Sequence, residues 1–140
     1  MNLNHVGISV VNLERSVQFY CNMLNMAVIY TAPFGGDPYE DVLAIPDVSG
    51  TMCVLKNNTV QLEIFHFERP EPATKSLDEP VSSHGISHFG VDVDDIDATY
   101  QRLAAGGVKM HSAVRQFPSG MRAVYVRDPD GNVIELLQRR

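Results

Sequence analysis

The sequence contains four side chains of two metal-binding kinds in a repeated order. His5 and Glu63 lie in the first half of the chain, and His88 and Glu135 lie in the second half. Neutral imidazoles and carboxylates are common ligands of divalent Ni, Co, Zn, Mn and Fe, and two carboxylates balance the charge of such an ion. The repeated His…Glu order therefore predicts one metal site built from a duplicated unit.

Each of the four residues has a simpler explanation when it is considered alone. Glu63 and Glu135 each have apolar neighbours on both sides. This pattern is also typical of a polar residue that faces water from a strand with one exposed face. His88 could be a core histidine with a satisfied hydrogen bond. The symmetric placement of all four residues favours the metal site over these separate explanations.

The first half of the chain is predicted to be a strand, a helix and further strands. Asn12 is expected to cap a helix over Leu13–Leu24, whose apolar residues recur at helical spacing. Asn25 is expected to end this helix in the left-handed conformation. The predicted strands are 5–11, 26–31, 51–56 and 60–67, with a loop rich in Gly, Asp and Pro over 33–38 and a short helix or strand over 40–45.

The second half repeats this order. Asp94 or Asp95 is expected to cap a helix that includes Ile96 and Leu103 and that ends at Gly106-Gly107. The predicted strands are 86–93, 108–112, 123–127 and 133–138, with a turn over 128–132. Between the halves, residues 68–83 contain three prolines and are expected to form a linker or flap without regular structure.

Alternation along the strands places the four candidate ligands on comparable faces. Side chains of a strand point alternately to its two faces, so His5, Glu63, His88 and Glu135 each lie opposite apolar neighbours that a helix could cover. If these strands are adjacent in space, all four side chains project from the concave side of a curved sheet.

The composition is that of an ordinary globular protein and excludes some partners. The chain has 140 residues, 44% of them hydrophobic and 20% charged, with a net charge of −6. The absence of a basic run argues against a nucleic-acid partner. No apolar stretch predicts a membrane helix, and the first residues do not resemble a signal peptide. We therefore expect a cytoplasmic protein in which Cys21 and Cys53 are buried free thiols.

Several motifs together resemble the vicinal oxygen chelate superfamily, which includes glyoxalase I, methylmalonyl-CoA epimerase, extradiol dioxygenases, and fosfomycin and bleomycin resistance proteins. The resemblance covers nearly the whole chain. The motifs are HVGI at 5–8, LERSVQFY at 13–20, VQLEIF at 60–65, HGISHF at 84–89 and RDPDGNVIEL at 127–136. The one departure is Asn25, where the family usually has Gly after the first helix.

The resemblance implies an α+β fold. Two tandem βαβββ modules would form a curled, mostly antiparallel sheet around a metal cleft. The chain would be a single domain over residues 1–140, with module 1 at about 3–67, the linker at 68–83 and module 2 at about 84–140. Homodimerisation is also implied, since exposed sheet edges of such modules commonly pair.

The family's metal positions fall on His5, Glu63, His88 and Glu135, which would bind one divalent ion (Ni, Co, Zn, Mn or Fe). Four protein ligands leave two positions for a small-molecule substrate with two neighbouring oxygens. The expected function is a lyase or isomerase of the glyoxalase or epimerase type, which abstracts a proton alpha to a carbonyl with a metal-stabilised enediolate. Glu135 or Glu63 is the candidate catalytic base.

Two alternatives remain open on the same scaffold. An Fe(II) extradiol-type dioxygenase would use only His5, His88 and Glu135, in a two-His, one-carboxylate set. Glu63 favours proton transfer, because its position is generally not a ligand in the dioxygenases. The other alternative is a metal-free protein that binds a small molecule or drug.

A second group of residues is considered for the pocket. Aromatic and Met side chains could line it or belong to the core, namely Tyr39, Phe65, Met121 and Tyr125. Arg122 or Arg115 could bind a glutathione carboxylate or a CoA phosphate, or be solvated at the surface. His66 and His111 are expected at the surface, and His84 could approach the site or lie at a loop end. Acidic residues at 92, 94, 95 and 97 are explained by helix capping and the helix dipole.

Overall fold

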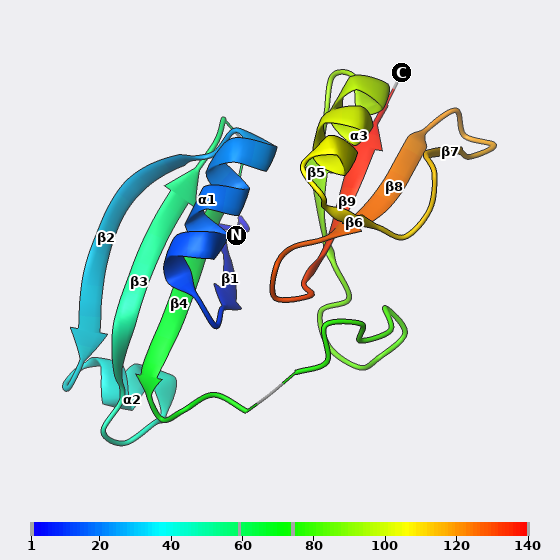
Figure 1. The fold of residues 1–140 in the computed structure, drawn as a ribbon. Helices are drawn as coiled ribbons and strands as arrows, with labels where there is room; N and C mark the ends of the chain where they lie inside the picture. Colours follow the sequence, from blue (N-terminus) through cyan, green and yellow to red (C-terminus); the bar gives the residue numbers. More distant parts are fainter. Residues whose placement is uncertain (1, 59, 74, 140) are drawn as a thin grey trace. The chain divides into compact units, whose positions relative to one another are not determined.

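The computed structural model of the chain (Figure 1) describes residues 2–58, 60–73 and 75–139. The chain divides into two compact units, unit 1 at residues 1–74 and unit 2 at residues 75–140. Each unit builds its own mixed sheet with a helix packed on it. The predicted α+β fold class is confirmed.

The sheet of unit 1 has the strand order β1-β4-β3-β2. β1 is parallel to β4, and the other neighbours are antiparallel. The strands are β1 (Val6–Ser9), β2 (Ala27–Gly35), β3 (Ser49–Lys56) and β4 (Gln61–Arg69). The parallel pairing of β1 with β4 brings the start of the chain beside the segment that contains Glu63.

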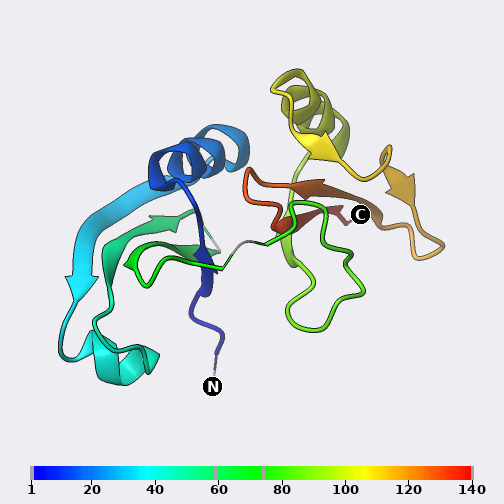
Figure 2. The ribbon, with the colours of Figure 1, turned by 60° about the horizontal axis from the view of Figure 1, so that its bottom comes forward.

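Helix α1 (Leu13–Leu24) covers one face of this sheet, as Figures 1 and 2 show. It contacts β3 and β4 and buries Tyr20 and Leu24, while Leu62 and Ile64 of β4 are fully buried. Because strand residues alternate, Glu63 and Phe65 point to the opposite face of the sheet. The helix thus fixes which face of β4 presents the carboxylate.

The other face of the unit 1 sheet carries an aromatic cluster. Phe34, which is 4% exposed, forms ring contacts with Tyr39, Phe65 and Phe67 at centroid distances of 5.3–5.6 Å. Tyr39 is the first residue of the short helix α2 (Tyr39–Leu43). Of the two predictions for residues 40–45, a short helix or a strand, the helix is therefore the one observed. The cluster lies on the face of Glu63 and continues the row of side chains along β4.

Unit 2 repeats the plan of unit 1 with shorter elements. Its strand order is β5-β9-β8-β6, β7 pairs with β8, and β5 is parallel to β9. Helix α3 covers one face of this sheet (Figure 2). The elements are β5 (Phe89–Asp92), α3 (Ile96–Ala105), β6 (Lys109–Met110), β7 (Arg115–Gln116), β8 (Arg122–Arg127) and β9 (Val133–Gln138).

The predicted helix caps are confirmed in both units. The side chain of Asn12 accepts a hydrogen bond from the backbone N–H of Arg15 at 2.9 Å, and Asp95 accepts one from Ala98 at 2.9 Å. Asn25 has φ of 53° and ends α1 in the left-handed conformation. Each N-cap lies three residues after the end of a strand, β1 or β5, and fixes where the following helix starts.

Several predicted strand boundaries were wrong. β2 continues through Pro33 to Gly35, where a loop was expected; as an edge strand it tolerates a residue without a donor. β5 begins only at Phe89, so His88 precedes the strand. β7 was not predicted at all, because it is two residues long and exists only through its pairing with β8.

Most of the segment between the sheets is held firmly against unit 2. Arg127 is 7% exposed, and its guanidinium donates to the carbonyls of Gly131 and Glu79, both at 2.8 Å. A Cβ on Gly131 would lie 2.7 Å from the backbone of Leu77, so the turn at residues 128–132 is in close contact with the segment that precedes β5. The predicted linker 68–83 also begins inside β4, which runs to Arg69.

The remaining sequence expectations concern cysteines and membrane helices. Cys21 and Cys53 are both free; Cys53 is buried, whereas Cys21 on the flank of α1 is only partly buried, contrary to the expectation. Burial and then the nearby Cys53 raise the pKa of the Cys21 thiol. Among the described residues, no helix is long and apolar enough to cross a membrane.

Candidate metal centre

In unit 1 the structure brings His5 and Glu63 together. Nε2 of His5 lies 3.4 Å from Oε2 of Glu63. His5 immediately precedes β1, and Gly7 is the register partner of Glu63 in the parallel pairing of β1 with β4. The two side chains are partly exposed, at 39% and 18%, so a solvent molecule or ion can reach them.

Unit 2 contains the same arrangement. Nε2 of His88 lies 3.3 Å from Oε2 of Glu135, with side-chain exposures of 29% and 17%. His88 immediately precedes β5, and Gly90 is the register partner of Glu135. In both units the histidine stands two positions before a glycine that faces the carboxylate.

The glycine opposite each carboxylate leaves space above the strand. A Cβ on Gly90 would lie 3.9 Å from Oε2 of Glu135 and 3.1 Å from Leu137. A Cβ on Gly7 would lie 4.0 Å from the ring of Phe65. A bulky residue at either position would fill the volume beside the carboxylate, so the small residue is part of the local geometry.

The second ring nitrogen of each histidine is occupied by the residue before it. Nδ1 of His5 lies 2.8 Å from Oδ1 of Asn4, which can only accept, so the proton is assigned to Nδ1 and the lone pair to Nε2. Nδ1 of His88 lies 2.8 Å from Oγ of Ser87. Metal-binding histidines commonly use their other nitrogen in this way. Sequence reasoning missed Asn4 and Ser87, although each is a polar residue directly before a candidate ligand.

The distances within the pairs fit two ligands of one ion. Ligand atoms about 2.1 Å from a metal, at octahedral or tetrahedral angles, are about 3.0–3.4 Å apart. The observed 3.4 Å and 3.3 Å separations fall in this range or at its upper end. Each pair also offers one neutral nitrogen and one carboxylate oxygen, which suits the borderline divalent metals.

The structure assembles the predicted ligands as two pairs, each within its own unit. Within the described part of the chain, no group of three or more His, Cys, Asp or Glu side chains is arranged to hold a metal. The pairing of His5 with Glu63 and of His88 with Glu135 is therefore the geometric result.

The two pairs differ in the residue beside the carboxylate. In unit 1 the antiparallel partner of Glu63 is Val54, whereas in unit 2 the partner of Glu135 is Tyr125. The hydroxyl of Tyr125 lies 3.4 Å from Nε2 of His88, and the two rings are 4.8 Å apart. Burial, and then the charge of Glu135, raise the pKa of Tyr125, so its phenol keeps its proton at neutral pH.

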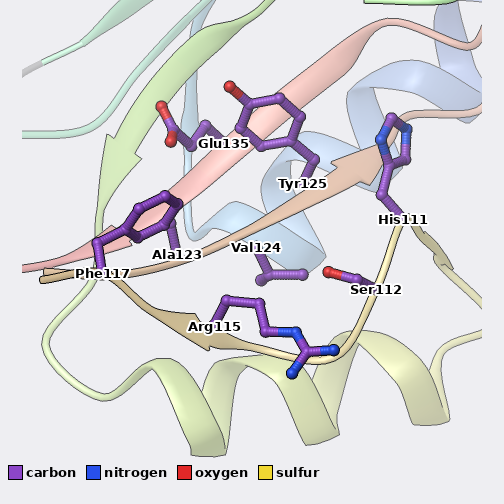
Figure 3. A pocket seen from close by; sticks show the side chains of 8 residues that line it. All are labelled: His111, Ser112, Arg115, Phe117, Ala123, Val124, Tyr125 and Glu135. Carbon is purple, nitrogen blue, oxygen red and sulfur yellow. The ribbon is translucent and has the colours of Figure 1, made fainter.

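A pocket of about 230 Å³ opens beside the pair in unit 2 (Figure 3). The predicted residues Tyr125, Glu135 and Arg115 line it; Met121 does not, and Phe117 does. The other lining residues are His111, Ser112, Ala123 and Val124. Burial, and then the charges of Arg127 and Lys109, lower the pKa of His111, so its imidazole is neutral at pH 7.

Other candidate residues have structural partners. Arg122 forms a bidentate ion pair with Asp97, with both distances 2.7 Å, and this contact lowers the pKa of the Asp97 carboxyl. His66 points away from Glu63, with Nδ1 3.3 Å from the carbonyl of Val10. His84 is exposed at a bend before β5. These residues stabilise local structure or face solvent.

Comparisons with known proteins show what the chain as a whole is similar to. A family model, Glyoxalase/Bleomycin resistance protein/Dioxygenase superfamily, matches residues 2–136. A probable lactoylglutathione lyase of Synechocystis sp. is 27% identical over 139 residues, covering 99% of this chain and 95% of that protein. The mitochondrial methylmalonyl-CoA epimerase of Dictyostelium discoideum is 32% identical over 109 residues, covering 77% of this chain and 58% of the relative.

A solved structure shows the same fold. The glyoxalase family protein of Bacillus cereus superposes with a TM-score of 0.90 at 21% sequence identity, covering 99% of this chain and 93% of that one. At this identity the similarity concerns the fold alone. It extends over both units.

Proposed function

Because the chain belongs to the glyoxalase/bleomycin resistance protein/dioxygenase superfamily, we propose that it is a metal-dependent lyase or isomerase that removes a proton alpha to a carbonyl. The substrate would be a small molecule with two neighbouring oxygens. The observation that supports this most directly is the equivalence of the two His–Glu pairs, at 3.4 Å and 3.3 Å.

Glu63 distinguishes this proposal from the dioxygenase alternative. A two-His, one-carboxylate site would need only His5, His88 and Glu135. Glu63, however, holds the same register position, the same distance to a histidine and nearly the same exposure as Glu135. This match supports Glu63 as a candidate ligand alongside Glu135.

The ion would be held by Nε2 of the two histidines and Oε2 of the two glutamates, namely His5, Glu63, His88 and Glu135. When bound, a divalent ion would polarise the substrate carbonyl and reduce the cost of the negative charge that develops on its oxygen. Asn4 and Ser87 orient the two imidazoles through Nδ1.

A carboxylate of the same set would take the proton. Glu135 is the first candidate and Glu63 the second, since a carboxylate that leaves the ion is free to accept the proton from the substrate C–H and both side chains are partly shielded from solvent. The neutral phenol of Tyr125 beside Glu135 can donate a hydrogen bond to an oxygen of the substrate.

The test is metal analysis of the purified chain with a matched set of variants. We expect one divalent ion per chain, and Glu63→Gln and Glu135→Gln should each weaken its binding by about tenfold or more. Glu68→Gln is the control, because Glu68 is exposed on the same strand as Glu63. Deuterium from solvent should enter the alpha position of a 2-oxo or thioester substrate.

The alternatives give different results in the same experiment. Bound iron with O₂ uptake on catechols, and unchanged metal content in Glu63→Gln, would replace the proposal by the dioxygenase. A chain that binds no divalent ion under any condition would replace it by the binding protein.

A further inference from the structure

Three arginines in the second half of unit 2 have different environments. The guanidinium of Arg127 is buried and donates to two backbone carbonyls, and that of Arg122 is held by Asp97. The guanidinium of Arg115 has neither an ion pair nor a hydrogen bond with any residue of the described ranges, and it lines the pocket beside Glu135. Arg115 is therefore the arginine whose charge is available to a ligand.

The strand register places Arg115 on the same face as the metal pair. Arg115 is opposite Ala123 in the antiparallel pairing of β7 with β8, and Ala123 is opposite Leu137 in the pairing of β8 with β9. Directly opposite residues project to one face, and Leu137 shares the face of Glu135. The side chain between Arg115 and β9 is only a methyl group, so little fills the space between them.

The pocket consequently has two chemically different ends. In Figure 3 the guanidinium of Arg115 lies near Ser112, whereas the carboxylate of Glu135 and the hydroxyl of Tyr125 lie on the other side. A cation thus stands at one end and the candidate metal pair at the other. The apolar groups of Ala123, Val124 and Phe117 lie along the walls.

The volume limits what can bind. Pockets for drug-sized ligands measure about 300–1,000 Å³, and this one is about 230 Å³. It suits a short acid better than a tripeptide or a nucleotide. An arginine with no protein partner binds a carboxylate through two parallel hydrogen bonds.

We propose that Arg115 is a specificity-determining residue that binds a second, distal carboxylate of a compact substrate whose oxygen pair reaches the metal at Glu135. This inference rests on the proposed function for the role of the metal end. It names the substrate class as short 2-oxo or 2-hydroxy acids with a further carboxylate.

The test compares 2-oxoglutarate with its 5-methyl ester, which lacks only the distal charge. Both are titrated into ¹⁵N-labelled full-length protein and followed by NMR, with and without added Co²⁺. Wild-type protein should bind the diacid about tenfold or more tightly than the ester. Arg115→Gln should abolish this preference, and Arg115→Lys should restore part of it.

Arg139→Gln is the matched control, because it removes one positive charge from the same unit at a residue that pairs with Asp92 at 3.6 Å outside the pocket. It should keep the preference for the diacid. Equal binding of diacid and ester by the wild type, or a preference that survives in Arg115→Gln, would overturn the inference.

The two proposals fail separately. If Co²⁺ does not bind, the proposed function fails, while the charge preference in the metal-free protein still reports on Arg115. If Co²⁺ binds and strengthens both ligands equally without an Arg115-dependent preference, only the inference about the distal carboxylate fails.

Discussion

Asn4 and Ser87 show how the residue before each histidine prepares a ligand. By occupying Nδ1, each leaves Nε2 directed at a carboxylate of its own unit. The repeat of residue types and order in the sequence singled out the four residues that form these two pairs. The two orienting residues were missed because asparagine and serine before a strand are too common to indicate a role.

At the same scale, Tyr125 would compete with the proposed metal for Nε2 of His88. Its hydroxyl lies 3.4 Å from Nε2 of His88, and a metal must displace that contact. Since such a hydrogen bond is worth about 0.5–1.5 kcal/mol, Tyr125→Phe should tighten metal binding by about two- to tenfold. Competition with a chromophoric chelator measures the affinity.

Tyr100→Phe, which removes a hydroxyl from α3 of the same unit, should leave the affinity unchanged. Weaker metal binding by Tyr125→Phe would show that the phenol supports the ligand set and does not compete with the ion.

Among the elements, the two long helices α1 and α3 could be predicted almost to the residue. Their caps at Asn12, Asn25 and Asp95 are local signals that depend on a few adjacent side chains. The strands were less well predicted, because their ends depend on partners far along the chain. β7 exists only because β8 lies beside it, and β2 continues past Pro33 because its outer edge is unpaired.

The aromatic side of unit 1 depends on a glycine in β3. A Cβ on Gly50 would lie 2.2 Å from the carbonyl oxygen of His66 and 2.7 Å from the ring of Phe34. Gly50→Ala should therefore lower the free energy of unfolding by about 1–3 kcal/mol or more, since backbone and ring must both shift. Urea denaturation followed by circular dichroism measures the loss.

The control is Gly7→Ala in β1, whose Cβ would meet only the ring of Phe65 at 4.0 Å. Its stability should be unchanged or raised by up to about 1 kcal/mol. Equal stability of the two variants would mean that the close approach at Gly50 relaxes without cost.

For the whole molecule, the outer edge of unit 1 bears on the proposed homodimer. β2 is an edge strand, and Val28, Ile29 and Tyr30 on it are 47%, 56% and 47% exposed. An apolar edge of this kind favours pairing with a second chain. We predict a dimer in sedimentation velocity, and Ile29→Lys should shift it toward the monomer.

Val42→Lys is the control, because Val42 is 80% exposed on α2 and lies outside this edge. A monomeric wild type, or a dimer that persists unchanged in Ile29→Lys, would exclude β2 as the contact.

The difference between Val54 and Tyr125 has an evolutionary consequence. Gene duplication gives two copies of one ligand pair, and the cross-strand neighbour of each carboxylate occupies the same register in both copies. A substitution there would alter the proton donors beside the carboxylate while leaving all four candidate ligands in place. One copy could therefore diverge toward new chemistry while the other kept its candidate metal pair, which would give a duplicated scaffold a route to many reactions.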